Sequence, residues 1–207
     1  CGRLVMDEVY SDFCVVPQGL PDTLKLMLDD SEPIISLRSF SKSAGLAGFR
    51  IGYIIASTSV ISAADTASNP FTMSRPALAA ANALFEPEGF AIWESTRQVQ
   101  IRDRKALEDK LQELPETNLT FGNSSTNFVV FETPSMLSQD LAQRLLTNHG
   151  IIVRPCASWG FPKHTRVSVG TTEEMDKFFN ALTEVLQQNE SQKETVAVGG
   201  GAFFESL

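Results

Sequence analysis

Short apolar runs of strand length alternate with segments of helical periodicity through the first half of the chain. Strands are expected at residues 4–6, 34–37 and 49–56, and helices at 24–28, 58–67 and 76–85. Such alternation is typical of α/β domains, in which the strands form a sheet and the helices cover it. In open α/β sheets, ligands bind beyond the carboxyl ends of the strands, so residues at those ends are candidate functional residues.

The second half has the pattern of an α+β domain. A long helical period at 90–114 ends at Pro115, and strands are expected at 119–121, 128–131, 151–153 and 166–169. A helix over 137–148 should be closed by Gly150, and another should begin at Thr171 or Thr172 and run to about Gln188. We therefore expect four parts: part of a large α/β domain (1–95), a connecting helix (96–115), a small α+β domain (116–188) and a disordered tail (189–207).

Charge and cysteine content disfavour several classes of protein. The chain has 17 basic and 25 acidic residues, a net charge of −8, which disfavours general binding to nucleic acids or anionic membranes. Cys1, Cys14 and Cys156 form no CxxC pair, so neither a disulfide framework nor a structural zinc site is indicated, and a cytoplasmic location with reduced thiols is expected. His149 and His164 lie in no nucleophile–base pattern, which argues against a Ser-His-Asp hydrolase. We expect no metal.

Two charged residues lie just past the ends of apolar strands. Asp7 follows the strand at 4–6, and Lys42 follows the strand at 34–37 after a short turn. Small residues surround Lys42 in the segment SFSKSAGLAG, so the backbone there can be approached closely. A single lysine is usually a solvated charge, and a single aspartate at a strand end is often a turn residue, so the combination carries the argument.

That combination resembles the class I and II aminotransferases. The segment SFSKSAGLAGFRIGY (39–53) is similar to the lysine segment of these pyridoxal-phosphate enzymes, and DEVY (7–10) is similar to their upstream Asp-Glu-x-Tyr element. Within the family, the sequence of this segment is most similar to that of histidinol-phosphate aminotransferases. The likeness continues through TNF (126–128), IIVR (151–154) and RVSVGT (166–171), to about residue 188. It implies the fold-type I transferase architecture, with a partial large α/β domain followed by a small α+β C-terminal domain.

The resemblance implies pyridoxal 5′-phosphate as cofactor and gives three residues roles at its ring. Lys42 would form the Schiff base and, once released by the incoming amine, move the substrate α-proton. Asp7 would pair with the protonated pyridine nitrogen, so that the ring can accept electrons. Tyr10 would donate a hydrogen bond to the phenolate oxygen.

The resemblance also implies a phosphate site and a substrate site. Arg50 would hold the cofactor phosphate, with Ser39 and Ser41 as hydroxyl donors. Arg166 would bind an anionic group of the substrate, a carboxylate or a phosphate. Arg154 would be the second arginine for a phosphorylated substrate, and a salt bridge at the rim is the alternative for this residue.

The implied reaction is transamination between L-histidinol phosphate and 2-oxoglutarate, a step of histidine biosynthesis. Its partners are a small-molecule amino donor and a 2-oxo acid. The alternatives are an aromatic amino-acid aminotransferase, a threonine-phosphate decarboxylase of the same fold, or an inactive assembly or binding domain. Because the chain opens at Cys1 almost directly on a strand, we expect a fragment whose longer parent is a homodimer, and the isolated piece could be inactive.

Overall fold

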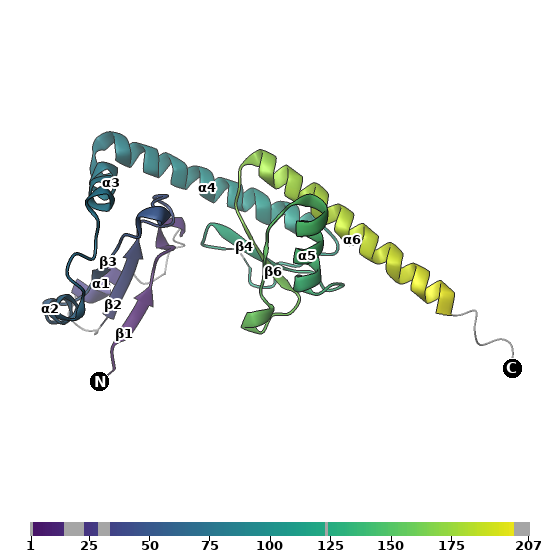
Figure 1. The fold of residues 1–207 in the computed structure, drawn as a ribbon, viewed down its shortest axis with the longest axis horizontal. Coiled ribbons are helices and arrows are strands. Elements are labelled where there is room, and N and C mark those ends of the chain that lie inside the picture. The colour runs from purple at the N-terminus through teal and green to yellow at the C-terminus, as the bar shows by residue number, and fades with distance from the viewer. Residues whose placement is uncertain (1, 15–22, 29–33, 123, 201–207) are drawn as a thin grey trace. The chain divides into compact units, whose positions relative to one another are not determined.

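A computed structural model describes residues 2–14, 23–28, 34–122 and 124–200 of the 207-residue chain. The chain divides into two compact units. The first comprises Cys1–Ile101 and Ser125–Asn127, and the second comprises Arg102–Ser124 and Phe128–Leu207. The long helix α4 (Pro87–Glu113) contains the boundary, between Ile101 and Arg102 (Figure 1).

The first unit is built on a three-stranded sheet in the order β1-β2-β3. Strand β1 (Leu4–Asp7) runs parallel to β2 (Ile34–Ser39), and β2 pairs antiparallel with β3 (Gly52–Ile55). The helices of this unit are α1 (Thr23–Leu28), α2 (Thr58–Ala67), α3 (Arg75–Phe85) and the first part of α4, with short 3₁₀ turns η1 (Ser11–Phe13) and η2 (Ala47–Phe49).

The start of α3 is set by two neighbouring residues. Ser74 caps this helix, because its Oγ accepts a hydrogen bond from the Ala77 amide at 3.3 Å, and Pro76 lies in the first turn, where no amide proton is needed. Ala77 and Ala81 are buried on one face and pack with Phe40 and Ile51. Small alanine side chains allow the helix to come close to the segment that carries Lys42.

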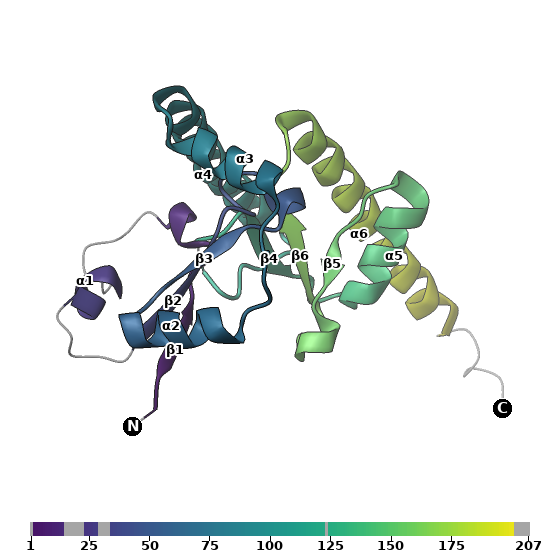
Figure 2. The ribbon, with the colours of Figure 1, turned by 60° about the vertical axis from the view of Figure 1, so that its left-hand side comes forward.

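The second unit is an antiparallel sheet packed against helices. Its strands β4 (Phe128–Glu132), β6 (His164–Ser168) and β5 (Arg154–Pro155) lie in that order. The 3₁₀ turn η3 (Ala157–Trp159) follows β5, and α5 (Ser138–His149) and α6 (Thr172–Gly200) lie side by side (Figure 2). The core contains fully buried apolar side chains from four helices and strands, among them Leu111, Phe131, Leu141 and Leu182. Burial of these residues is the main stabilising term for the unit.

Helix ends of the second unit follow the expected chemistry. Gly150 closes α5 in the left-handed conformation, with φ 68°, and its amide bonds to Leu146 O. Before α6, the Thr171 hydroxyl accepts from the Glu174 amide, and Glu174 Oε2 accepts from the Thr171 amide at 2.7 Å. This reciprocal pair is a capping box. Its hydrogen bonds to the carboxylate hold the pKa of Glu174 below its usual range.

Three expected strands differ from the structure by more than two residues at an end. The strand expected at 49–56 is confined to Gly52–Ile55, because pairing with β2 begins where Gly52 meets Ser39. Residues 119–121 form a turn, which is closed by a hydrogen bond from the Gly122 amide to Leu119 O. This turn lies next to an isolated β-bridge between Asn118 and Glu132. Residues 151–153 are not a strand, since the Ile151 amide bonds back to the end of α5 and pairing starts only at β5.

The end of α6 was also placed too early. The helix continues past Gln188 to Gly200, so the expectation of a disordered tail is wrong for 189–200. Asn189 Nδ2 donates to Ser135 O at 3.4 Å, which attaches this part of the helix to the second unit. The remainder of the expected tail, 201–207, lies outside the described residues. Within the part of the chain that is described, no helix combines the length and the apolar character needed to cross a membrane.

Candidate functional site

The carboxyl ends of β1 and β2 bring the first predicted site residues to one edge of the sheet. Asp7 is the last residue of β1 and lies opposite Leu37, and Ser39 ends β2 two positions further on. Asp7 Oδ1 accepts a hydrogen bond from the Val9 amide at 3.3 Å, which turns the chain away from the strand. The Asp7 side chain is exposed at this edge, where a ligand can reach it.

The predicted lysine and tyrosine are in direct contact. Lys42 Nζ lies over the ring of Tyr10, 4.9 Å from its centroid, in a cation–π arrangement. Lys42 is half-buried and begins a turn after β2, which is closed by a hydrogen bond from the Gly45 amide to Lys42 O at 3.1 Å. Gly45 has φ 71°, a conformation that side chains larger than hydrogen disfavour. The turn therefore directs an amine toward a phenol at the same sheet edge.

Ser39 and Ser41 form a turn of their own. Ser39 Oγ accepts from the Ser41 amide at 3.0 Å and lies 3.4 Å from Ile51 O, to which it donates. Both side chains are half-buried. The Ser39 hydroxyl therefore shapes the loop, and a role for both hydroxyls at a phosphate stays a prediction.

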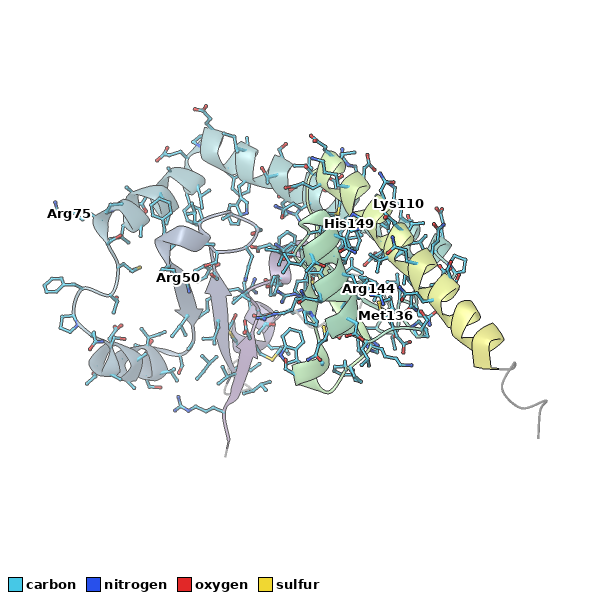
Figure 3. The ribbon with its side chains drawn as sticks, turned by 45° about the vertical axis from the view of Figure 1, so that its right-hand side comes forward. Arg50, Arg75, Lys110, Met136, Arg144 and His149 are labelled. Atoms are coloured by element: carbon cyan, nitrogen blue, oxygen red, sulfur yellow. The ribbon has the colours of Figure 1, made fainter. Side chains whose placement is uncertain are left out.

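Arg50 follows η2 and is exposed (Figure 3). Its Nη1 donates to Ala47 O at 3.0 Å, and its backbone is left-handed, with φ 54°. This conformation is uncommon outside glycine, and such strained positions concentrate at functional sites. The exposed guanidinium keeps further donors for an anion.

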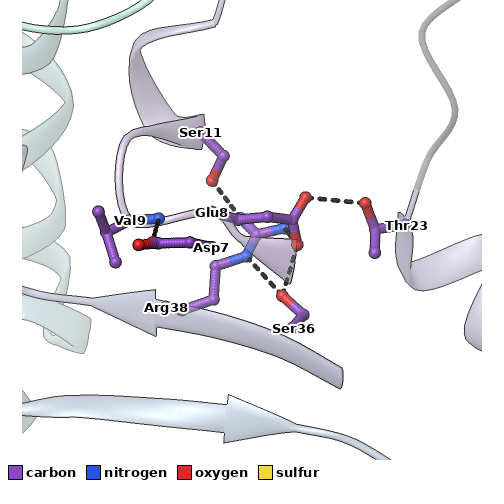
Figure 4. Close-up of polar contacts among 7 residues, drawn as sticks. All are labelled: Asp7, Glu8, Val9, Ser11, Thr23, Ser36 and Arg38. Atoms are coloured by element: carbon purple, nitrogen blue, oxygen red, sulfur yellow. Dashed lines mark hydrogen bonds and ion pairs between the residues drawn. The ribbon is translucent and has the colours of Figure 1, made fainter. Parts of the chain in front are cut away.

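Beside the predicted site residues, Glu8 forms polar contacts that the sequence did not indicate (Figure 4). Its carboxylate accepts hydrogen bonds from Ser36 Oγ and, at 2.7 Å, from Thr23 Oγ1, and it forms an ion pair with Arg38 Nη2 at 3.2 Å. Arg38 Nη1 also donates to Ser11 Oγ at 2.5 Å. Glu8 and Arg38 thus fix the end of β1, next to Asp7, and the start of the turn that carries Tyr10.

Electrostatics at Glu8 follow from these contacts. Burial raises the pKa of this carboxyl, but hydrogen bonds from Ser36 and Thr23 and the charge of Arg38 outweigh it, so the pKa lies below its usual range. The Glu8 carboxylate is therefore charged at neutral pH. One sequence feature could have indicated this ion pair: Arg38 is a charged residue at a half-buried position of β2, where it needs a partner.

The two predicted substrate arginines lie in the second unit, on neighbouring strands. Arg154 of β5 is the register partner of Arg166 of β6. Like charges opposite each other on neighbouring strands are unfavourable, and a bound anion would offset their repulsion. Both residues line a cavity of about 720 Å³, together with residues 150–153, 167–170 and the start of α6.

Arg166 is held by aromatic side chains. Its guanidinium lies 4.7 Å from the ring centroid of Phe128 and 5.9 Å from that of Trp159. Among the described residues, its buried Nε has no hydrogen-bond partner. The neighbouring Cys156 thiol is buried, which raises its pKa despite the opposing charge of Arg166, so the thiol is protonated at neutral pH. The positive charge of the two arginines is therefore not neutralised by this thiol.

Comparison with known proteins gives consistent matches. The model of the family described as aminotransferase class I and II matches residues 1–182. Histidinol-phosphate aminotransferase 2 of Methylococcus capsulatus is 39% identical over 184 residues, covering 88% of this chain and 47% of that protein. The chain thus spans about half the length of the curated relatives it matches.

Solved structures share the same fold. The crystal structure of histidinol-phosphate aminotransferase from Sinorhizobium meliloti in complex with pyridoxal-5'-phosphate matches with a TM-score of 0.74 and 28% identity, over 90% of this chain and 49% of that chain. A decarboxylase from Sulfurospirillum multivorans matches with a TM-score of 0.78 and 23% identity, over 89% and 52% respectively. The second match shows the fold alone. Together they confirm the expected fold-type I class and the resemblance from which it was predicted.

Proposed function

Because the chain belongs to the aminotransferase class I and II family, we propose that it carries the lysine-bearing part of a pyridoxal-phosphate-dependent aminotransferase. The observation that carries the proposal is the contact of the half-buried Lys42 ammonium with Tyr10, at the sheet edge where β1 ends in Asp7. An amine, a phenol and a carboxylate at one edge are the groups that this cofactor needs.

The donor set fits pyridoxal 5′-phosphate. Lys42 is the amine for the aldehyde, and Tyr10, whose ring lies under this amine, offers a phenolic hydroxyl. Asp7 provides an exposed carboxylate for a protonated ring nitrogen, and Arg50 provides free guanidinium donors for a phosphate. When bound, the cofactor supplies the electron sink that stabilises negative charge at the substrate α-carbon. Lys42, once free, is the base positioned to take and return the α-proton.

The substrate class follows from the second unit. We propose that Arg154 and Arg166 bind an anionic group, since two guanidiniums opposed across a strand pair favour an anion. An amino donor and a 2-oxo acid are then the substrates. We propose L-histidinol phosphate and 2-oxoglutarate, as part of histidine biosynthesis, with support from the 39% identical relative.

Three alternative functions would give other outcomes in the tests below. A threonine-phosphate decarboxylase would use the same lysine and release CO₂, and the match to a decarboxylase supports the shared fold alone. An aromatic amino-acid aminotransferase would accept amines without phosphate. An inactive domain would hold no cofactor. We further propose that the full-length parent is a homodimer and is cytoplasmic, the latter supported by the free thiols of Cys14 and Cys156.

Trapping of the cofactor on Lys42 tests the proposal. The purified 207-residue chain is mixed with pyridoxal 5′-phosphate and reduced with borohydride, and the labelled peptides are identified by mass spectrometry. We expect the label to concentrate on Lys42, to disappear in Lys42→Ala and to persist in Lys163→Ala, which removes an exposed lysine of the second unit. Equal labelling of many lysines, unchanged in Lys42→Ala, would contradict the proposal for this chain.

Substrate class is tested at the arginine pair. Urea unfolding of the second unit is followed by Trp159 fluorescence with and without phosphate or a dicarboxylate. We expect the anion to stabilise the unit and the effect to be lost in Arg166→Gln. No stabilisation of the unaltered chain by either anion would contradict the assignment.

A further inference from the structure

Ser43, the residue after Lys42, is a buried residue at the centre of a polar cluster whose other members are half-buried. Its side chain is 2% exposed. Ser43 Oγ donates a hydrogen bond to Asp12 Oδ2 and accepts one from Trp93 Nε1 at 3.1 Å. These partners come from η1 and from α4, 31 and 50 positions away in the sequence. One hydroxyl thus joins three segments of the first unit.

The Ser43–Asp12 contact runs beside the contact that carries the proposed function. Tyr10 and Asp12 belong to the same turn, in which the Phe13 amide bonds to Tyr10 O at 3.0 Å. Lys42 and Ser43 are consecutive. The two segments therefore meet twice, once through Lys42 on the Tyr10 ring and once through Ser43 on Asp12. The second contact fixes the spacing of the first.

Helix α4 also contacts Asp12, the residue that accepts the Ser43 hydrogen bond. Arg97 Nη1 donates to the backbone oxygen of Asp12 at 2.8 Å. Arg97 is itself held by Glu94, which accepts from its Nε and Nη2 at 2.8 and 2.7 Å. Arg97 and Trp93 lie one turn apart on α4, so this helix forms hydrogen bonds with both the Asp12 turn and the Ser43 hydroxyl.

We propose that Ser43 is a positioning residue that holds Lys42 against Tyr10. The inference rests on the proposed function, in which Lys42 is the reacting amine. An indole N–H can only donate, and a carboxylate can only accept, so the group between them must do both. A hydroxyl meets this requirement, and alanine does not. Threonine keeps the hydroxyl and is the conservative replacement.

Lysine footprinting without cofactor tests the geometry. The chain is treated briefly with acetic anhydride, and acetylation of Lys42 is compared with that of Lys177, whose side chain is 68% exposed in the second unit. We expect Ser43→Ala to raise the Lys42:Lys177 ratio about fivefold, the factor that corresponds to the loss of one ordinary hydrogen bond. Ser43→Thr should return the ratio toward that of the unaltered chain.

Ser74→Ala is the matched control. It also removes a serine hydroxyl that forms a hydrogen bond in the first unit, at the N-terminus of α3. A purely structural loss would therefore raise the Lys42 ratio in both variants, whereas positioning predicts a change in Ser43→Ala alone. Equal ratios in the unaltered chain and Ser43→Ala, or an equal rise in Ser74→Ala, would overturn the inference.

Cofactor trapping separates this inference from the proposed function. In Ser43→Ala we expect the share of borohydride-fixed pyridoxyl label on Lys42 to fall about fivefold. If the unaltered chain does not label Lys42 but the acetylation contrast holds, the proposed function fails for this chain and the contact of Ser43 with the lysine segment stands. If labelling is selective but identical in Ser43→Ala, the function stands and the positioning role is refuted.

Discussion

Replacement of Glu8 by glutamine should destabilise the first unit in a pH-dependent way. The Glu8 carboxylate accepts from the hydroxyls of Ser36 and Thr23 and pairs with Arg38 at 3.2 Å. Glutamine has nearly the same shape, but only one of its terminal atoms can accept. The variant therefore removes the charge and leaves one hydroxyl without its acceptor, while the packing is preserved.

The magnitude lies between that of a surface pair and that of a buried pair. The side chains of Arg38 and Glu8 are 20% and 14% exposed. Exposed ion pairs contribute roughly 0–1 kcal/mol, and breaking a fully buried pair costs roughly 3–5 kcal/mol. With one further hydrogen bond lost, we expect Glu8→Gln to lower the free energy of unfolding by about 2 kcal/mol at pH 7.

The pH dependence has a defined sign. The pKa of Glu8 in the folded chain lies below its ordinary value of 4.5, because hydrogen bonds from Ser36 and Thr23 and the charge of Arg38 outweigh the effect of burial. A carboxyl with a depressed pKa stabilises the fold above its unfolded pKa, and this contribution is lost as the pH falls through the folded value. The difference in the free energy of unfolding between Glu8→Gln and the unaltered chain should therefore narrow below about pH 4.5.

The assay is urea unfolding followed by Trp93 fluorescence in a Trp159→Phe background, so that the signal reports the first unit. Glu86→Gln, which neutralises an exposed carboxylate of the same unit, is the control and should change little. Equal stability of Glu8→Gln and the unaltered chain at pH 7 would refute the reasoning. A deficit that stays constant between pH 7 and pH 3 would refute the electrostatic part of it.

Two further predictions concern other parts of the chain. Leu182→Ala removes a fully buried side chain from the core of the second unit and should cost about 3–5 kcal/mol by urea unfolding, whereas Leu146→Ala, at a side chain that is 47% exposed, should cost far less; similar losses would contradict the assignment of the core. Hydrogen bonds from Arg97 lower the pKa of Glu94 to about 2, so Arg97→Met should return the Glu94 titration in NMR toward its ordinary value of 4.5, and an unchanged titration would show that the pair does not form in solution.

Much of the fold could be predicted because its signals are local. Helix α2 begins and ends as its periodicity indicated, and Gly150 closes α5 as expected. Each of these depends on residues a few positions apart, whose chemistry is visible in the sequence. Strand assignments at 119–121 and 151–153 failed, since a strand exists only where another strand pairs with it.

The residues of the candidate site also differ in how far the sequence indicated them. The motifs at 7–10 and 39–53 indicated Asp7, Tyr10 and Lys42, whose roles at the cofactor stay predictions; the structure shows that Lys42 lies over the Tyr10 ring. The roles of Arg50, Ser39 and Ser41 at a phosphate stay predictions.

The sequence by itself determined the family, the alternation of strands and helices, and the residues that bear the proposed chemistry. The tertiary structure alone decided which polar groups support them. Glu8 meets Ser36 across 28 positions, and Ser43 meets Trp93 across 50. Arg154 faces Arg166 only through the register of two strands. Periodicity and capping depend on neighbours along the chain, whereas these contacts depend on how the sheet and helices pack, which no local pattern specifies.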